Sequence, residues 1–365
     1  MAYEIQTRSV KLSELTKYAK HHFATKRPVM VWGPPGIGKS ETFEGIKESY
    51  EAAGLRAKLI DARLSLWEPT DLKGYPYYDK EANKMRFSAP DELPDEAMAA
   101  EYDIIILFLD ELNGAAPATQ AAAYQLILNR AIGTYKLPDN VVIAAAGNRE
   151  TDKGVTYRMP KPLANRFLHY EVRVDFEDWF DWAVKHNIHP DVVGYLTTFK
   201  EDLYNFDANS AERSFATPRS WTFVSDTVQD VAGFTEEEVT DMVAAAIGEG
   251  KALKFKAHRE IAGQLPNPSD ILAGKVKDLR TDNISAKYSL TTALCYELKE
   301  AHDNDNELNK KFDNFLEFIQ SNFETEMVVM ACTIALGKYK IRVKFNQLKN
   351  WKPFIERYGK LIETV

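Results

Sequence analysis

The feature that most constrains this chain is a glycine-rich turn placed directly after an apolar run. Residues 29–43 read VMVWGPPGIGKSETF and contain the pattern GxxxxGK[ST]. Glycines in such a turn can adopt backbone angles closed to residues with a Cβ, so successive N–H groups can converge on phosphate oxygens. The helix that should follow adds the positive end of its dipole. A strand before the turn and a helix after it predict a phosphate-binding loop, and therefore a chain that binds a nucleoside triphosphate.

Two side chains of this loop have different predicted roles in binding the phosphates and their magnesium ion. Lys39 supplies a point charge for the β and γ phosphates, and the Ser40 hydroxyl is placed to ligate a magnesium ion. The alternative is an ordinary strand-to-helix turn with a solvated lysine, which the apolar run before the loop disfavours. The predicted cofactor-binding residues are Gly33, Pro34, Pro35, Gly36, Ile37, Gly38, Lys39 and Ser40.

The rest of the first half predicts an α/β fold. Helical spacing after Ser9 indicates a short amphipathic helix, and apolar runs at 57–62, 104–109, 141–146 and 168–174 indicate strands. Apolar runs separated by helical stretches are typical of a mainly parallel sheet covered by helices on both faces. The phosphate loop should then lie at the carboxyl edge of that sheet.

The second half predicts helices only. We expect an α/β nucleotide-binding core at 1–174, a helical lid domain at 175–265 and a helical C-terminal extension at 266–365. The proline-containing segment GQLPNPSD indicates the boundary between the lid and the extension. Length alone favours two or three domains. The extension could cap an assembly, bind a client or enlarge the lid, and amphipathic spacing does not separate these roles.

Composition restricts the class of partner. The chain has 46 basic and 54 acidic residues and a net charge of −8, which gives no general attraction to a polyanion, although a local basic patch stays open. No signal peptide or run of about 20 apolar residues is visible, so we expect a cytoplasmic protein without a membrane segment. The two cysteines, Cys295 and Cys332, are consistent with a reducing compartment.

Two carboxylates follow the apolar run at 104–109. A strand-end aspartate in a P-loop enzyme holds magnesium opposite the loop hydroxyl, and Asp110 fits that role. Glu111, the next residue, could polarise a water for attack on the γ phosphate. The alternative is that Asp110 and Glu111 are ordinary exposed acids at the end of a strand. The phosphate-binding loop upstream disfavours that alternative.

Three further polar residues are candidates for catalytic roles. Asn148 ends a strand of small residues that could lie between the loop strand and the Asp-Glu strand, where its amide could position the attacking water. Arg166 in LANRF and Arg219 in TPRSW can each supply charge at a phosphate. Taken singly, either arginine also fits a surface residue or a structural ion pair.

Together these elements carry a family resemblance. GPPGIGKS, ILFLDEL, AAAGN, LANRF and TPRSW follow the order and context of the AAA+ ATPases, and the combination resembles the MoxR branch over residues 25–265. The resemblance implies an ATP hydrolase that uses Mg²⁺, with residues 33–40 as Walker A, Asp110 and Glu111 as Walker B, and Asn148 as sensor one. It also implies a homo-oligomeric ring, commonly a hexamer, in which Arg166 reaches a neighbour's nucleotide and Arg219 is sensor two in the lid.

Features around these motifs leave alternatives open. Arg158 in TYRMP is either a second interface arginine or a solvated loop charge. Tyr75, Tyr77 and Phe87 flank a polar turn, which predicts a β-hairpin at 75–89. In MoxR-like proteins such a hairpin faces the pore or a partner, and an edge hairpin with partly buried tyrosines fits the alternation equally well.

The leading hypothesis is a chaperone-like ATPase that remodels or activates a protein partner. The resemblance implies that the client is a separate protein, because MoxR-like proteins often act with a partner that carries a von Willebrand factor A domain. A nucleic-acid-dependent motor or clamp-loader-like ATPase is an alternative that the acidic net charge disfavours. An ATP-gated assembly scaffold is a third hypothesis, and a small-molecule kinase is a remote fourth.

Overall fold

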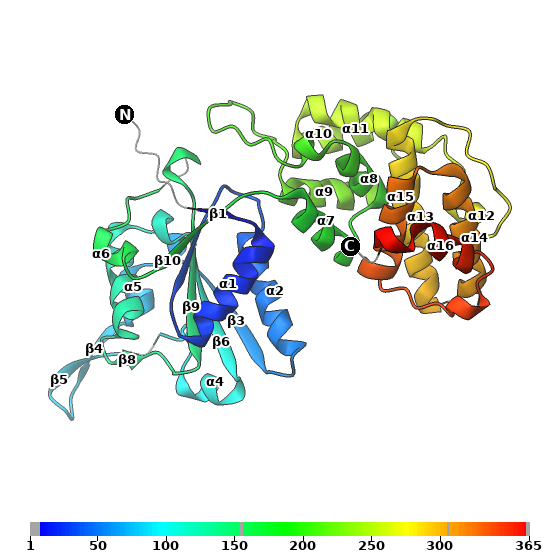
Figure 1. Cartoon of the computed structure of the whole chain (residues 1–365). Helices are drawn as coiled ribbons and strands as arrows, with labels where there is room; N and C mark the ends of the chain where they lie inside the picture. The colour runs from blue at the N-terminus through cyan, green and yellow to red at the C-terminus, as the bar shows by residue number, and fades with distance from the viewer. Residues whose placement is uncertain (1–7, 89, 153–155, 305–306, 363–365) are drawn as a thin grey trace. The chain divides into compact units, whose positions relative to one another are not determined.

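The computed structural model describes residues 8–88, 90–152, 156–304 and 307–362 (Figure 1). These residues form two compact units. The first runs to Asp175 and includes residues 207–210, and the second contains Phe176–Phe206 and the chain from Ala211 onward. The predicted division of the helical part into 175–265 and 266–365 stays a prediction.

A six-stranded sheet forms the centre of the first unit. Its order is β1-β10-β2-β9-β6-β3, and every neighbouring pair is parallel. The fold class predicted from the sequence, a parallel sheet flanked by helices, is confirmed. The strands are β1 (Ser9–Val10), β2 (Val29–Trp32), β3 (Ala57–Arg63), β6 (Ile104–Asp110), β9 (Val141–Gly147) and β10 (Leu168–Val172).

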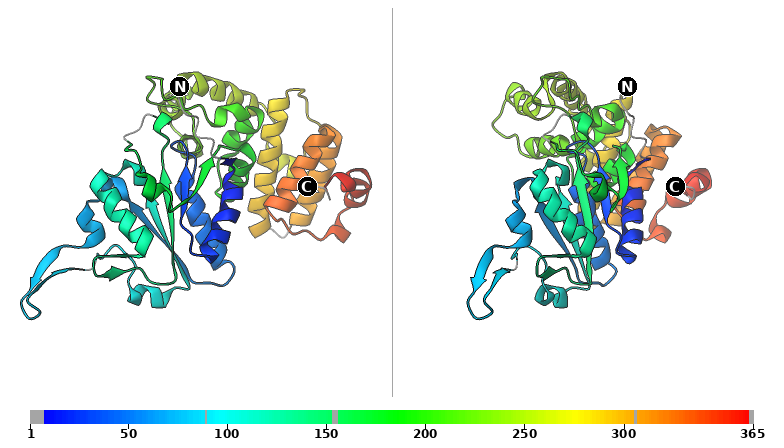
Figure 2. Two further views of the ribbon diagram at one scale, coloured as in Figure 1. Left: turned by 60° about the vertical axis from the view of Figure 1, so that its left-hand side comes forward. Right: turned by 90° about the vertical axis from the view of Figure 1, so that its left-hand side faces the viewer.

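Helices cover both faces of the sheet (Figure 2), and the strands are accordingly apolar on both sides. Phe43 of α2 (Lys39–Glu51) packs on Phe108 of β6 with ring centroids 4.6 Å apart. On the other face, Met30, Leu107 and alternate residues of β9 join a core with α5 (Pro117–Asn129). The remaining helices of this unit are α1 (Leu12–Ala24), α3 (Pro69–Lys73), α4 (Glu96–Glu101) and α6 (Lys161–Ala164), with 3₁₀ turns at Leu64–Leu66, Leu112–Gly114 and Glu150–Asp152.

Two short antiparallel hairpins interrupt the alternation of strands and helices. One joins β4 (Pro76–Asp79) to β5 (Lys84–Phe87), and the other joins β7 (Ala131–Ile132) to β8 (Tyr135–Lys136). The hairpin predicted at 75–89 is therefore present over residues 76–87, and residue 89 lies outside the described residues. The edge strand Ser9–Val10 was not predicted, since two residues are too short to leave a periodic pattern.

Among its described residues, the second unit contains helices and connecting loops but no strand. A turn of π-helix (Thr333–Lys338) extends α15, and 3₁₀ turns occur at Lys200–Leu203 and Phe345–Gln347. Its helices are α7 (Phe176–Lys185), α8 (Pro190–Thr198), α9 (Pro218–Gln229), α10 (Glu236–Ile247), α11 (Glu249–Ala262), α12 (Pro268–Leu272), α13 (Ile284–Asn304), α14 (Leu308–Asn322), α15 (Thr325–Cys332) and α16 (Trp351–Ile362). In the described part of the chain, no helix has both the length and the apolar character needed to cross a membrane.

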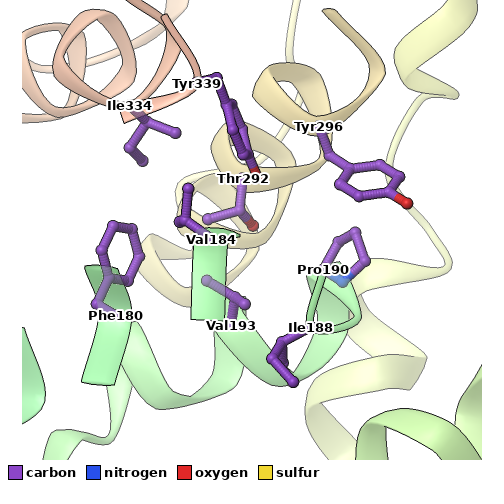
Figure 3. Close-up of a pocket in the computed structure, with 9 residues that line it drawn as sticks. All are labelled: Phe180, Val184, Ile188, Pro190, Val193, Thr292, Tyr296, Ile334 and Tyr339. Atoms are coloured by element: carbon purple, nitrogen blue, oxygen red, sulfur yellow. The ribbon is translucent and has the colours of Figure 1, made fainter. Parts of the chain in front are cut away.

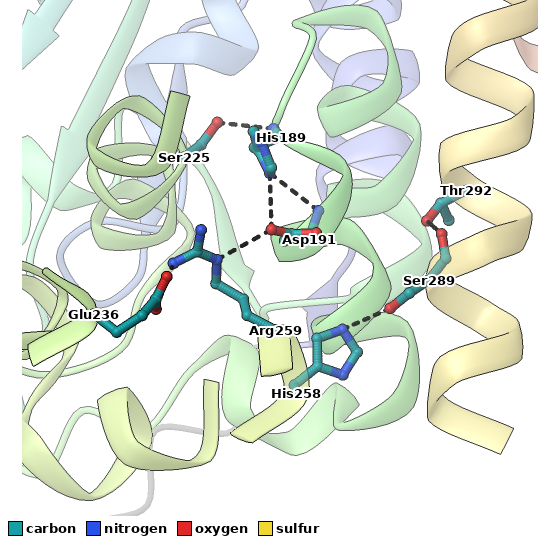
Figure 4. A network of polar contacts seen from close by, with 8 residues as sticks. All are labelled: His189, Asp191, Ser225, Glu236, His258, Arg259, Ser289 and Thr292. Carbon is teal, nitrogen blue, oxygen red and sulfur yellow. Dashed lines mark hydrogen bonds and ion pairs between the residues drawn. The ribbon is translucent and has the colours of Figure 1, made fainter. Parts of the chain in front are cut away.

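Polar contacts join several helices of this unit (Figure 4). Arg259 of α11 donates to Asp191 of α8 at 3.2 Å and pairs with Glu236 of α10 at 3.5 Å. The buried His258 ring contacts the Ser289 hydroxyl of α13 at 2.7 Å. Helices α8 and α13 approach closely, because a Cβ on Gly194 would lie 2.6 Å from the Ser289 hydroxyl.

A shallow pocket opens beside α7, α8 and α13 (Figure 3). Its volume is about 240 Å³ when the space open to solvent is counted, and none of the nine residues that line it is charged. Phosphate-binding sites need cationic or N–H donors, so this pocket does not suit a nucleotide phosphate.

Candidate nucleotide-binding site

The predicted phosphate loop connects β2 to α2 at the carboxyl edge of the sheet. Gly36 and Gly38 have φ values of 75° and 93°, the left-handed region that favours glycine. Gly33 does not have a positive φ, so the sequence-based argument about backbone angles does not apply to it. Glycine is needed there for space, because a Cβ would lie 2.7 Å from Ile37 Cδ1 and 3.3 Å from the Val172 carbonyl.

The Lys39 side chain lies across the loop. Its ammonium donates to the carbonyls of Gly33 and Pro34 at 2.7 and 2.9 Å, and to Asn148 Oδ1 at 3.2 Å. Helix α2 begins after Gly38 without a side-chain cap, so the positive end of its dipole faces the same region. The loop thus combines a cation with a helix N-terminus, the two features that attract phosphate.

Ser40 and Asp110 meet although they lie seventy positions apart. The Ser40 hydroxyl donates to Asp110 Oδ2 at 3.1 Å, and Asp110 Oδ1 accepts from the Glu111 backbone N–H at 2.8 Å. This contact brings the first turn of α2 to the end of β6. A hydroxyl beside a carboxylate is a donor set that suits Mg²⁺, which prefers oxygen ligands.

Glu111 has a left-handed backbone at φ 53° and ψ 34°, which is uncommon for a residue with a side chain. Its carboxylate accepts a hydrogen bond from the Ser65 hydroxyl, in the turn that follows β3. Glu111 is exposed, and this contact ties its carboxylate to the turn that follows the neighbouring strand. Such local strain recurs at functional sites and persists where the surroundings fix it.

Negative charge collects at the ends of β3 and β6. Burial raises the pKa of Asp61 above its ordinary value, and the nearby charges of Asp110 and Glu111 add to that effect. Arg63 acts in the opposite direction. A carboxyl whose pKa is raised partly by neighbouring carboxylates indicates a negative potential, which favours a cation nearby.

Asn148 follows β9, which the structure places between β2 and β6 as predicted. Its side-chain oxygen faces Lys39, as described above. Its backbone is fixed by Asn113, whose amide donates to the Asn148 carbonyl at 2.8 Å and whose Oδ1 accepts from the Asn148 N–H at 3.2 Å. Asn113 is only 3% exposed. The buried Asn113 side chain therefore fixes the position of the Asn148 backbone through these two hydrogen bonds.

Sequence reasoning missed Asn113 and Ser65. Asn113 lies two residues after Glu111, and a buried asparagine so close to the Asp-Glu pair is the one signal that could have identified it. Ser65 stands in an unremarkable LSL segment. Its partner is evident only when β3 and β6 are adjacent in the sheet.

The three candidate arginines differ in their surroundings. Arg166 and Arg158 belong to the first unit, Arg219 belongs to the second, and all three are exposed. Among the residues that the structure describes, none of the three side chains has a hydrogen-bond or ion-pair partner. Within the described residues, neither Arg166 nor Arg219 therefore forms the structural ion pair that the sequence left open, and the role of Arg158 stays open.

The local sequence explains how Arg219 is presented. Thr217 Oγ1 accepts from the Ser220 N–H at 3.0 Å, and Ser220 Oγ accepts from the Thr217 N–H at 2.8 Å. This capping box, with Pro218 at the first helical position, starts α9 directly before Arg219.

A hydrogen-bonded link joins the loop strand to the segment that carries Arg166. Trp32, the residue before the loop, donates its indole N–H to His169 Nδ1 at 2.8 Å, and the two rings stack. His169 Nε2 lies 2.7 Å from the Ala164 carbonyl. Because Nδ1 accepts, Nε2 carries the proton and donates it to that carbonyl. The end of α6 is thereby tied to β2, two residues before Arg166.

The hairpin β4–β5 has two chemically different faces. Its register pairs Pro76 with Phe87 and Tyr78 with Met85, so one face is apolar. Tyr78 and Met85 are 57% and 65% exposed. The opposite face carries Tyr77, Asp79, Lys84 and Arg86, with an ion pair of 2.6 Å between Arg86 and Asp79. The tyrosines are exposed, which contradicts the alternative of an edge hairpin with partly buried tyrosines, and a contact of the hairpin with a pore or partner stays a prediction.

Comparisons with known proteins agree with this description at low similarity. No family model matches the chain. The MoxR protein of Methylorubrum extorquens is 23% identical over 167 residues, which is 45% of this chain and 43% of that protein. The chain thus matches less than half the length of this curated relative.

Solved structures of ATPases also align with the chain. A putative ATPase from Cytophaga hutchinsonii aligns over 98% of this chain and 89% of its own, with 12% identity and a TM-score of 0.36. A RuvB variant from Thermotoga maritima aligns over 68% of this chain and 74% of its own, with 17% identity and a TM-score of 0.34.

The class follows from the strand order and from the motifs at the strand ends. A parallel sheet with a Walker A loop after β2, an Asp-Glu pair after β6 and an asparagine after the strand between them defines a P-loop nucleotide-binding core of the AAA+ type. Within that class the chain resembles the MoxR branch, in agreement with the curated relative.

Proposed function

We propose that this protein hydrolyses ATP with Mg²⁺ at the subunit interfaces of a homo-oligomeric ring, commonly a hexamer, and uses the energy to remodel or activate a protein partner. The observation that carries the proposal is the convergence of three adjacent strand ends. Ser40 lies 3.1 Å from Asp110, and Lys39 lies 3.2 Å from Asn148. A cation, a magnesium-type donor pair and a polar amide thus surround one small region.

Each residue of this region has a distinct task in the proposal. Residues 33–40 bind the phosphates through backbone N–H groups, and Lys39 exchanges its carbonyl partners for phosphate oxygens. Ser40 and Asp110 would hold the magnesium ion, which supplies charge neutralisation when it is bound. Glu111 orients the attacking water and accepts its proton, and Asn148 fixes the position of that water.

The arginines complete the site from elsewhere. Arg166 is exposed and has no partner among the described residues, so its charge is available to a nucleotide held by a neighbouring subunit. Arg219 senses the γ phosphate in the same subunit. An arginine supplied in this way is worth roughly a thousandfold or more in turnover, so an isolated protomer should hydrolyse ATP poorly.

The hairpin supports a polypeptide as the partner. An isolated two-stranded hairpin is marginally stable, and an exposed apolar face adds to its cost in water. The face formed by Pro76, Tyr78, Met85 and Phe87 suits the apolar side chains of a protein client more than a phosphate backbone. A protein with a von Willebrand factor A domain is the partner that the MoxR resemblance favours.

Mixing two inactive variants tests the interface. Glu111→Gln retains Arg166 but lacks its own base, and Arg166→Ala retains its base but lacks the finger. Each homogeneous assembly should bind ATP and lose most hydrolysis. In randomly mixed assemblies, about a quarter of the sites pair an intact base with an intact finger, so activity should return to about a quarter of the wild-type rate.

Arg27→Ala is a matched control, because Arg27 is also an exposed arginine of the first unit. It should hydrolyse ATP at the wild-type rate. Wild-type turnover in Arg166→Ala, or no recovery in the mixture, would contradict hydrolysis at a shared interface. Affinity capture with Glu111→Gln in ATP then identifies the client, and recovery of no protein would contradict remodelling.

A further inference from the structure

Although the net charge of the chain is negative, a segment near the C-terminus is basic. Between residues 327 and 355 there are six basic residues and no acidic ones, in a chain with 54 acidic residues in all. One of the six, Lys338, pairs with Asp181. The others are Lys340, Arg342, Lys344, Lys349 and Lys352, and all five are exposed. None of the five side chains has an ion-pair partner in the described part of the chain.

Three of these cations alternate along the chain with less exposed residues. Exposure alternates along the segment, since Ile341 is buried and Val343 is partly buried, whereas Lys340, Arg342 and Lys344 are exposed. The backbone of residues 340–344 is neither helix nor strand, and Lys340 has a left-handed φ of 52°, so the alternation shows which side chains are exposed and does not define a regular strand. Lys340, Arg342 and Lys344, called the charge ladder below, are thus three exposed cations within five residues of the chain, and they can contact phosphates of a nucleic-acid strand.

A column of aromatic rings ends beside this ladder. Phe345, Trp351, Phe354 and Tyr358 are in ring contact in that order, with centroid distances of 4.2, 5.6 and 5.2 Å. Phe354 and Tyr358 are buried, whereas Phe345 at the end of the column is 40% exposed. An unpaired base can extend such a column by stacking on its last ring.

We propose that residues 340–352 form a binding surface for a single-stranded nucleic acid. The charge ladder would contact the phosphates, and Phe345 would stack on a base. Cationic side chains alone would also attract an acidic peptide, but an exposed ring at the end of an aromatic column favours bases. The surface is fixed to α14, because Asn309 Oδ1 accepts from the Lys344 N–H and Asp313 Oδ1 accepts from the Asn350 N–H, both at 2.9 Å.

Acidic groups near the segment limit its attraction without cancelling it. Asp313 lies under Asn350 on α14, Glu307 precedes that helix, and Glu356 is exposed on α16. Glu307 lies 3.8 Å from Lys310, which offsets its charge. Five unpaired cations against these acids leave a net positive surface.

Fluorescence anisotropy with the full-length protein tests the proposal. The probes are fluorescein-labelled oligo(dT) and oligo(U) of about 12 nucleotides, a typical site size. We expect binding whose logarithmic affinity falls with the logarithm of salt concentration, with a slope of about −2 to −3.5 for three to five phosphate contacts. The triple variant Lys340→Gln, Arg342→Gln, Lys344→Gln should reduce that slope by about 2.

Phe345→Leu separates stacking from charge. Leucine preserves apolar packing on Trp351 but offers no aromatic face, so affinity should fall about 5- to 150-fold while the salt slope is unchanged. The matched control is Lys17→Gln with Lys185→Gln, two exposed lysines outside the segment, and it should bind as the wild type does.

Three results would overturn the proposal. They are no binding at 50 mM salt, binding that the triple variant and Phe345→Leu leave unchanged, and tighter binding of a poly-glutamate peptide than of either oligonucleotide. The hydrolysis assay above uses other residues. Loss of oligonucleotide binding and loss of interface catalysis can therefore be told apart.

Discussion

Replacing Asn113 by aspartate tests whether its amide fixes the end of β9. The ionised variant keeps an acceptor for the Asn148 N–H but loses the donor to the Asn148 carbonyl. The new carboxylate oxygen would stand near 2.8 Å from a carbonyl oxygen, at a site that is 3% exposed. Two acceptors then face one another without a proton between them.

The magnitude follows from these contacts. A lost hydrogen bond costs about 0.5–1.5 kcal/mol, and a buried acceptor left without a donor costs about 1–3 kcal/mol more. We therefore expect the local stability at the end of β9 to fall by about 2–4 kcal/mol. Hydrogen exchange of the peptide that covers residues 141–149 should accelerate about 30- to 1,000-fold at neutral pH. Local exchange is the appropriate assay, because a two-unit chain need not unfold in one step.

The sign of the pH dependence provides the refutation. Burial beside a carbonyl, with Asp110 and Glu111 close in the chain, should raise the pKa of the new carboxyl above its unfolded value. The native state then binds more protons than the unfolded state, so the variant loses stability as pH rises through that raised pKa. Protonation at lower pH restores the donor. Equal exchange in variant and wild type, or a deficit that is independent of pH, would show the reasoning wrong, and exposed Asn165→Asp is the control.

Three further predictions address other contacts. Ser65→Ala should lower kcat at least about tenfold with little change in KM, because Glu111 loses its positioning hydrogen bond, and Ser65→Thr should restore the rate. Trp32→Phe keeps the stack on His169 but removes the indole donor, so single-turnover hydrolysis should slow about 2- to 12-fold while the ATP Kd is unchanged. Burial lowers the pKa of His258 to about 4, so stability of the second unit should fall by about 3 kcal/mol as pH drops from 6.5 to 4, and a urea titration of His258→Asn should lack that slope.

The sequence predicted the features that depend on neighbours along the chain. The loop, its strand and its helix occupy residues 29–51 without interruption, so the pattern GPPGIGKS defines all three. The apolar run at 104–109 could be predicted as a strand because a strand buried on both faces of a parallel sheet is continuously apolar. The small residues before Asn148 allowed the correct placement of β9 between β2 and β6.

Contacts between distant segments could not be predicted in this way. Ser65 and Glu111 are forty-six positions apart, and no periodicity connects them. The same is true of Trp32 and His169, whose pairing depends on β10 lying beside β2. Sequence patterns report which face of an element is apolar, whereas side-chain partners depend on the register between strands.

The hairpin shows how register resolves an ambiguity. Aromatic alternation at 75–87 fitted a packed edge and an exposed surface equally well. Pairing of Tyr78 with Met85 collects the apolar side chains on one face, and exposed fractions above one half for both residues exclude a packed edge. A shift of one residue would have mixed the two faces.

The distribution of fixed and unpartnered charges explains why the proposed enzyme needs a second subunit. Lys39, Asp110 and Glu111 are each held by at least one hydrogen bond within the first unit, so their positions are set by the fold. Arg166 is tied to the sheet only through its backbone neighbours, and its side chain has no partner among the described residues. A preorganised set of acids and a cation binds a nucleotide, but charge that develops on the transferred phosphoryl group requires a further cation. In the function proposed above, the exposed Arg166, on a segment anchored to the loop strand, would supply that cation to an adjacent copy and so couple the order of one phosphate loop to catalysis in the next.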